Sequence, residues 1–395
     1  MAELVLAFIG VICIGYWNWR YAMRGEFKPR EKVWLQLLFI YHLAFSGIFS
    51  WYIGQNGGDA VRYWNLTADV SYQPVDWMDY WGHGTRFLQW LNFVPSKVFG
   101  LDFWFGNLLF ALVSWLGLRE LVALLISRFG NVTNRWLVVF GWTILFLPNL
   151  HFWSAGVGKE AWLLLGIGLA SRGYRSWSTD GFWSLLGLAL AFWVRPVFGM
   201  ALGLVMLGWF LLDPGIDGKK KAIISLVALL AGALGIWKLS VMMHLEEISL
   251  ASVQAFSRSQ FDFLSGFGAR SEIPMDGYSW LEKLWALYFR PLPWEALGFW
   301  QMAAAVENLF ALGLIAAGIV FGLIALRGGV ALHIPSWVLA GVVFGALMTW
   351  VHGLTLNNLG IIMRMKSTFM IFVYFLSWQV VVLGIKHIIA RNEKS

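Results

Sequence analysis

The sequence predicts an all-α, polytopic membrane protein with about eleven transmembrane helices, and three observations lead to this prediction. Hydrophobic residues make up 59% of the 395 residues, whereas only 13% are charged. Soluble domains carry about 25% charged residues, so this charged fraction is too low for a water-exposed surface. Apolar runs of bilayer-spanning length recur along the chain. The 26 tryptophans fit a chain that meets the membrane–water interface many times.

Eight apolar runs are long enough to cross a bilayer, and each predicts one transmembrane helix. These runs cover residues 3–19, 33–53, 103–126, 135–153, 222–241, 309–326, 334–352 and 367–385. A shorter run at 160–171 predicts a further helix. The apolar run from Phe182 to Leu212 is too long for one ordinary span, and Arg195-Pro196 interrupts it. Because proline disfavours the helical conformation of the residue before it, we expect a broken hairpin of two short helices with Arg195 at the turn.

The lysine and arginine residues of the short loops predict the orientation of the chain in the membrane. They fall on one side if the N-terminus lies outside and the C-terminus lies in the cytoplasm. The outer face then receives the loops at 54–102 and 242–307, the corner at 151–160 and Arg195. We therefore expect one integral membrane domain over residues 1–395, with amphipathic juxtamembrane helices in the two long outer loops.

Charge and cysteine content exclude several other classes of protein. The formal charge of +7 is spread over the loops, whereas nucleic-acid binding needs a clustered basic face. The single cysteine, Cys13, excludes an intramolecular disulfide and a cysteine-based metal site. Carboxylates that suit a divalent cation occur in one outer loop, at Asp59, Asp69, Asp76 and Asp79. Their spacing matches no known cage, so we expect no metal cofactor.

The segment from Asn56 to Trp64 carries acidic, basic and aromatic residues directly after an apolar run. If a helix starts here, Asp59 lies at or near its N-cap, with Arg62 and Tyr63 on the same face. A carboxylate, a guanidinium and aromatic rings at the membrane surface suit chemistry on a lipid-carried polar substrate. Asp59 is therefore our candidate general base or electrostatic stabiliser. The alternative is that Asp59 only caps the helix.

Two further outer segments carry candidate contacts. In the segment Trp81 to Arg86, His83 and Arg86 are secondary substrate-binding candidates. In the corner Pro148 to Glu160, Lys159 and the backbone N–H groups of a helix start suit a phosphate. A lysine that snorkels beside an adjacent glutamate is the alternative. The corner lacks the first glycine and the Ser or Thr of a P-loop, so nucleotide binding is rejected.

Arginines at three outer positions complete the candidate set. Arg195 lies between two apolar runs with no acid near it in sequence, which indicates a functional role. Pairing with a structural acid such as Glu307 is the alternative. Arg290 and Arg364 lie in other segments expected on the outer face. Guanidinium groups bind phosphate oxygens bidentately, so these arginines suit a pyrophosphate leaving group.

The pattern Gly58-Asp59-Ala60-x-x-Tyr63-Trp64 after an early membrane helix resembles the first outer loop of GT-C-type membrane glycosyltransferases. The chain is also similar to multispanning proteins of bacterial exopolysaccharide and O-antigen gene clusters, including polymerase-like ones. The segments that carry this similarity are Asn149–Trp153, Val194–Pro196, Phe289–Glu295 and Asn358–Arg364. No second acid adjoins Asp59, so the Asp-x-Asp pattern of some relatives is absent and metal use is not implied.

The resemblance implies transfer of a sugar from a polyprenyl-phosphate-linked donor to a glycan acceptor, at the periplasmic face of the bacterial inner membrane. We expect the catalytic residues to be Asp59, Arg62 and Arg195. We expect the substrate-binding residues to be Tyr63, Trp64, His83, Arg86, His151, Lys159, Arg290, Glu295 and Arg364. Two alternatives remain open: a flippase or exporter of the lipid-linked glycan, and a non-catalytic membrane subunit of an envelope assembly complex.

Overall fold

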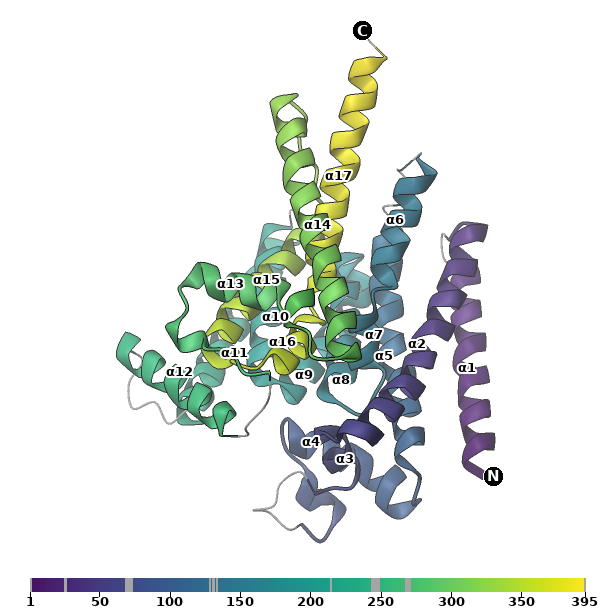
Figure 1. Cartoon of the computed structure of the whole chain (residues 1–395), viewed down its shortest axis with the longest axis vertical. Coiled ribbons are helices and arrows are strands. Elements are labelled where there is room, and N and C mark those ends of the chain that lie inside the picture. Colours follow the sequence, from purple (N-terminus) through teal and green to yellow (C-terminus); the bar gives the residue numbers. More distant parts are fainter. Residues whose placement is uncertain are drawn as a thin grey trace. The chain divides into compact units, whose positions relative to one another are not determined.

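The computed structural model describes residues 2–24, 27–67, 74–127, 129, 132, 134–213, 215–242, 249–266 and 271–393. This described part of the chain is all-helical, with 82% helix and no β-strand. Its α-helices are α1 (Ala2–Arg24), α2 (Pro29–Asn56), α3 (Asp59–Trp64), α4 (Thr85–Asn92), α5 (Phe103–Ile126), α6 (Arg135–Leu145), α7 (Pro148–Ser154), α8 (Lys159–Ser171), α9 (Trp177–Val194), α10 (Pro196–Leu212), α11 (Gly218–Met242), α12 (Leu250–Ser265), α13 (Trp280–Phe289), α14 (Phe299–Arg327), α15 (Ser336–Thr355), α16 (Leu359–Lys366) and α17 (Met370–Asn392) (Figure 1).

Seven helical segments among the described residues are long and apolar enough to cross a membrane. They are α1, α2, α5, α6 with α7, α14, α15 and α17. The helices α9 and α10 are apolar but shorter, and α8 has 13 residues. At 1.5 Å per residue, α8 extends for only about 20 Å, which is less than the bilayer core. The all-helical membrane class is therefore confirmed, whereas the expected number of eleven crossings is not.

The predicted break at Arg195 is present. The helix α9 ends at Val194, and α10 begins at Pro196. Arg195 has φ −147° and ψ 100°, an extended conformation, as expected for a residue before proline. Two backbone hydrogen bonds continue across the turn: Arg195 N donates to Ala191 O, and Gly199 N donates to Arg195 O, each at 2.9 Å. The turn therefore presents the Arg195 side chain at a helix junction.

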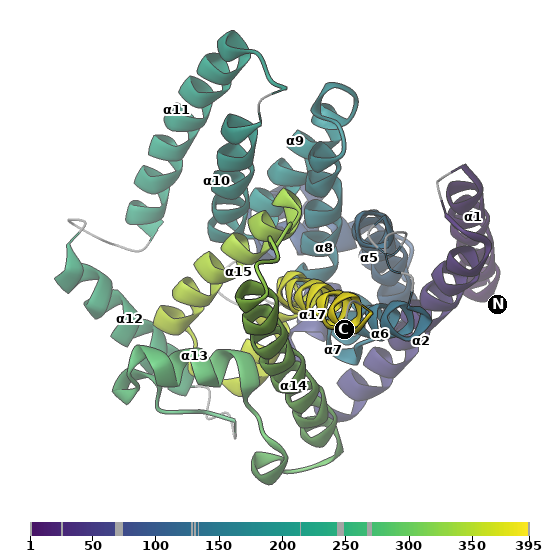
Figure 2. The same ribbon diagram turned by 90° about the horizontal axis from the view of Figure 1, so that it is seen from above.

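The chain forms two compact units, which are described separately: unit 1 (Met1–Gly199) and unit 2 (Met200–Ser395). In unit 1, α8 lies between α5 and α9 (Figure 2). Glycines bring these backbones into direct contact. A Cβ atom on Gly117 of α5 would overlap Leu164 O of α8, and one on Gly187 of α9 would overlap Gly166 O. Small residues permit such close packing of membrane helices, and the packing fixes the start of α8, where Lys159 and Glu160 lie.

In unit 2, α17 packs against both α14 and α15, and Figure 1 shows α14 running alongside α17. A Cβ atom on Gly318 of α14 would lie 3.1 Å from Ser377 Cα of α17. The helices α12, α13 and α16 surround a second core of buried residues: Phe261, Ile273, Met275, Ala286, Leu287 and Ile362. This smaller core supports the segment that carries Arg290 and Arg364.

Candidate functional site

Three segments that the sequence predicts on the outer face meet in unit 1: the loop that carries His83, the corner that leads into Lys159, and the turn at Arg195. Gly84, with φ +64°, donates its backbone N–H to Trp193 O at 3.0 Å. A Cβ atom at Gly84 would lie 3.6 Å from Lys159 Nζ and 3.7 Å from Val194 O. The His83 ring centroid lies 4.3 Å from that of Trp193. The segment around His83 therefore lies against both the end of α9 and the start of α8.

Arg195 pairs with Glu160, an acid that the sequence did not indicate as its partner. Arg195 Nη2 lies 3.0 Å from Glu160 Oε1. The Glu160 side chain is only 2% exposed, whereas that of Arg195 is 29% exposed. A buried carboxylate needs a charged or hydrogen-bonding partner to offset its lost hydration. Glu160 was not among our predicted site residues, and the polar corner before α8 was the only sequence signal for it.

The short helix α3 joins this cluster through Tyr63, because Lys159 Nζ lies 5.8 Å from the centroid of the Tyr63 ring. Asn92 Nδ2 donates to Tyr63 O, and Trp64 Nε1 donates to Leu101 O, each at 3.1 Å. Tyr63 and Trp64 are buried in the core of unit 1. These rings therefore anchor α3, and their predicted role as platforms for a substrate ring stays a prediction.

Asp59 is the first residue of α3, after the N-cap Gly58. This agrees with its expected position at or near the N-cap. Asp59 and Arg62 are both exposed, on a helix whose other side is held in the core. Asp59 thus lies at a fixed helix start and faces solvent, which suits a group that accepts a proton from a substrate.

An aromatic cluster extends from the same loops. Trp81 lies 4.8 Å from Trp90 and 5.1 Å from Trp193, measured between ring centroids. Trp77 stacks on Trp90 at 4.9 Å. Trp81 is 44% exposed, so the cluster has an open rim. Among the described residues, the buried indole N–H groups of Trp90, Trp162 and Trp193 have no hydrogen-bond partner. The exposed aromatic face of Trp81 suits stacking against a polar ring such as a sugar.

His151 lies elsewhere in unit 1, fully buried inside the helices. Its Nδ1 lies 2.9 Å from His42 Nδ1, and its Nε2 lies 2.7 Å from Leu145 O. Both ring nitrogens are therefore engaged with the protein. Its predicted substrate contact stays a prediction.

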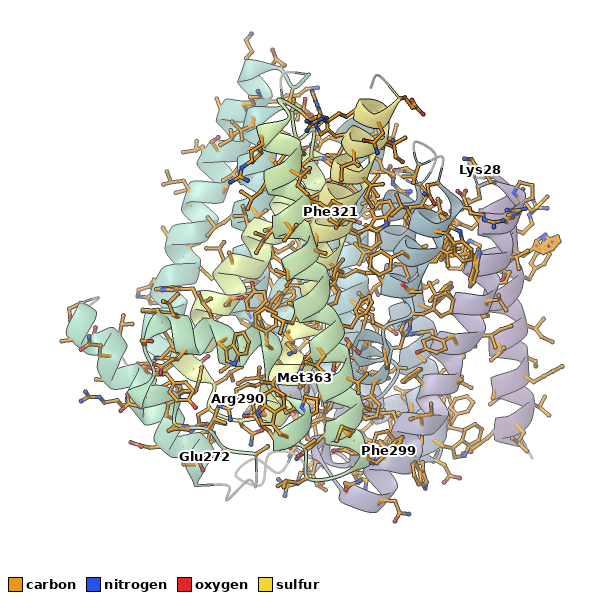
Figure 3. All side chains as sticks on the ribbon, turned by 45° about the horizontal axis from the view of Figure 1, so that its top comes forward. Lys28, Glu272, Arg290, Phe299, Phe321 and Met363 are labelled. Carbon is orange, nitrogen blue, oxygen red and sulfur yellow. The ribbon has the colours of Figure 1, made fainter. Side chains whose placement is uncertain are left out.

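Arg290, Glu295 and Arg364 belong to unit 2. Arg290 Nε lies 2.7 Å from Glu295 Oε1, and Arg290 Nη1 donates to Tyr278 OH at 2.8 Å. Arg364 lies on α16, whose first turn is capped by Asn358: its Oδ1 accepts from the N–H groups of Gly360 and Ile361. Figure 3 labels Arg290 and Met363 in the same region of this unit, below Phe321 (Figure 3). The sequence predicted Arg290 and Arg364 as phosphate ligands and Glu295 as a substrate contact, and in the structure Arg290 contacts Glu295 and Tyr278.

Lys366, at the end of α16, is a buried cation that the sequence did not indicate. It is 3% exposed, and its Nζ donates to Asn308 Oδ1 at 2.7 Å and to Tyr288 O at 3.0 Å. Burial lowers the pKa of Lys366 to about 7, and the Glu307 carboxylate opposes this shift. Asn308 Nδ2 in turn donates to Pro291 O at 2.9 Å. Lys366 and Asn308 therefore tie α13, α14 and α16 to the segment that carries Arg290.

A groove of about 710 Å³ separates α10 from α15 in unit 2. Its lining is apolar except at one end, where Asp213 and Ser336 lie. None of the predicted site residues lines it, so the groove adds nothing to the candidate site.

No group of three or more His, Cys, Asp or Glu side chains suited to a metal occurs within the described residues. Of the four aspartates weighed for a cation, Asp69 lies outside the described residues. Comparison with protein-family models, with curated proteins and with solved structures found no match. The functional assignment therefore depends on the geometry of the loops in unit 1 and on the sequence pattern around Asp59.

Proposed function

We propose that this chain is a membrane glycosyltransferase or polysaccharide polymerase. It transfers a sugar from a polyprenyl-phosphate-linked donor to a glycan acceptor at the periplasmic face of a bacterial inner membrane. The proposal includes about eleven crossings, an outer N-terminus and a cytoplasmic C-terminus. The observation that supports it best is the meeting of Lys159, Arg195 and Glu160 with His83 and the aromatic loops in unit 1.

The reaction requires removal of one proton and stabilisation of one leaving group. The exposed Asp59 accepts the proton of the acceptor hydroxyl as that oxygen attacks the anomeric carbon of the donor. The bond from that carbon to the polyprenyl phosphate oxygen breaks, and the phosphate leaves with the electron pair. Lys159 and Arg195 stabilise the developing phosphate charge. Glu160 holds the Arg195 guanidinium at 3.0 Å and so fixes its orientation.

The aromatic cluster suits the sugar. Trp81 contributes an exposed ring at its rim. The indole N–H groups of Trp90 and Trp193 are buried inside the cluster, so the exposed face of Trp81 is the part of the cluster that offers a contact to the sugar. Stacking on aromatic rings is tolerant of sugar identity, and hydrogen bonds supply the selectivity.

The direct test is Asp59→Asn in purified full-length protein reconstituted in lipid nanodiscs with a polyprenyl-phosphate-linked sugar and an acceptor glycan. We expect transfer to fall by about 100-fold or more, because general base catalysis contributes about that factor. Asp76→Asn, at another exposed acid of the same loop, is the matched control and should retain activity. Normal product formation by Asp59→Asn would remove Asp59 from the mechanism. Donor inversion across vesicles without bond formation would instead identify a flippase.

A further inference from the structure

Unit 1 contains a buried line of polar side chains beneath the site, between α2, α5 and the corner that precedes α8. Its members are Ser50 and His42 of α2, Asn107 and Ser114 of α5, and His151 of α7. His42, Asn107, Ser114 and His151 are fully buried. Burying polar groups in such apolar helices is costly unless each group is hydrogen-bonded. The hydrogen bonds of these side chains therefore show which segments of unit 1 they hold together.

Asn107 makes the first two hydrogen bonds of this line. Its Nδ2 donates to Ser50 Oγ at 2.8 Å, and its Oδ1 accepts from Val157 N at 2.8 Å. Val157 lies in the non-helical corner, two residues before Lys159. One amide therefore connects α2, α5 and the backbone of the corner.

The two histidines, His42 and His151, make the second set of contacts in this line. His151 Nε2 lies 2.7 Å from Leu145 O, so this nitrogen must carry the proton of a neutral ring. His151 Nδ1 then accepts from His42 Nδ1 at 2.9 Å. His42 Nε2 lies 2.8 Å from Ser114 Oγ, and Ser114 Oγ also lies 3.1 Å from Ala111 O. Each of the four histidine nitrogens therefore lies within hydrogen-bond distance of a polar atom, and these contacts hold α7 to α2 and α5.

Tight packing also holds the corner between the Asn107 contact and the histidine contact. A Cβ atom on Gly156 would overlap the Phe49 ring of α2. Ala155 and Val157 on either side are buried. The corner backbone thus lies directly on α2, and it leads into Lys159 and Glu160.

We propose that Asn107 is a positioning residue, which fixes the corner through Val157 and thereby places Lys159 for phosphate binding and Glu160 for its contact with Arg195. The contact between His42 and His151 holds the same corner at its other end. This inference rests on the proposed function for its chemical consequence, but its structural part stands by itself. Asn107 touches no substrate in this account, because it acts through the Val157 amide.

The test compares three variants of the full-length protein in nanodiscs by hydrogen–deuterium exchange over residues 150–162. Asn107→Leu removes the acceptor of the Val157 amide, and we expect exchange there to become about tenfold faster. Asn107→Asp retains the acceptor oxygen and should stay within about twofold of the wild type. Ser50→Ala removes only the other partner of Asn107, so it should also stay near the wild type. Asn107→Ser, too short to reach Val157, replaces Asn107→Leu if the latter does not fold.

The second readout is the kinetics of transfer. Asn107→Leu should lower kcat by about tenfold with little change in KM, and Asn107→Asp should restore it, because misplaced Lys159 and Glu160 affect the leaving group more than donor binding. Unchanged exchange in Asn107→Leu, or equal acceleration in Ser50→Ala, would overturn the positioning role. If the wild type transfers no sugar yet the exchange pattern holds, the proposed function fails and the positioning of the corner stands.

Discussion

Arg195 in unit 1 and Lys366 in unit 2 are both cations in largely apolar surroundings, yet their partners differ. Arg195 pairs with a buried carboxylate, that of Glu160, and its side chain remains 29% exposed. Lys366 is 3% exposed and donates to neutral oxygens of Tyr288 and Asn308. A cation enclosed by carbonyl groups ties chain segments together. A cation that is oriented by a buried acid and still reaches the surface can meet a ligand, so we place the reaction in unit 1.

Removing the acid from the Arg195 pair should produce the largest effect. Glu160→Leu leaves Arg195 without its carboxylate, and we expect a loss of about 2–3 kcal/mol of stability together with loss of transfer. This figure is at the low end for buried pairs because Arg195 is partly exposed. Denaturant unfolding of the purified variant measures it. The double variant Glu160→Leu/Arg195→Leu should recover most of the stability but none of the activity, and recovered activity would contradict the role of Arg195.

The next largest effect concerns helix packing at glycine, where substitution should destabilise unit 1 more than unit 2. Gly117→Ala places a Cβ atom against Leu164 O of α8, so α5 and α8 must separate. We expect a loss of about 2 kcal/mol, since neither backbone can yield cheaply. Gly318→Ala in unit 2 meets Ser377 Cα at 3.1 Å and should cost about half as much. Thermal unfolding of both variants makes the comparison, and an equal or reversed order would show that α8 is not tightly held.

The lowered pKa of Lys366 should make the free energy of unfolding depend on pH. Its pKa is about 7 in the folded protein and 10.5 in the unfolded chain, so between these values the unfolded state binds the extra proton. Stability contributed by this group is therefore fully present above about pH 10 and is lost as the pH falls toward 7. The slope is at most about 1.4 kcal/mol per pH unit. Unfolding midpoints of the wild type and of Lys366→Met over this range isolate the effect, because the variant should lack this slope.

The smallest expected effect concerns the aromatic rim. Trp81→Ala should raise KM for the donor by about threefold to tenfold, as expected for one lost stacking contact. Trp294, which is 78% exposed in unit 2, provides the matched control, and Trp294→Ala should leave KM unchanged. Equal effects of the two substitutions would indicate general interfacial roles for these tryptophans.

The sequence predicted the elements that local patterns determine. Membrane helices follow from long apolar runs, and the break at Arg195 follows from Pro196. The start of α3 at Asp59 follows from the preference of aspartate for positions at or near the N-cap. The number of crossings is not confirmed, because α8, α9 and α10 are apolar but shorter than the seven candidate spans among the described residues. Hydropathy reports apolarity more reliably than it reports helix ends.

The contacts between distant residues could not be predicted in the same way. Glu160 lies 35 residues from Arg195, and Lys366 lies 58 residues from Asn308. No periodicity connects such pairs, since they meet only when the helices pack. The contact of His151 with His42 on α2 is another such pair: the polar corner carried no sign of it, and the predicted substrate contact of His151 stays a prediction. A buried polar residue and a binding residue look alike in sequence until their partners are known.

The most direct measurement is a density map of the full-length protein in nanodiscs with a bound polyprenyl-phosphate-linked sugar. We predict that the phosphate lies within hydrogen-bond distance of Lys159 and Arg195, that the sugar lies beside Trp81, and that the Asp59 carboxylate faces the anomeric centre. A phosphate held only by Arg290 or Arg364, with the unit 1 cluster empty, would contradict this prediction.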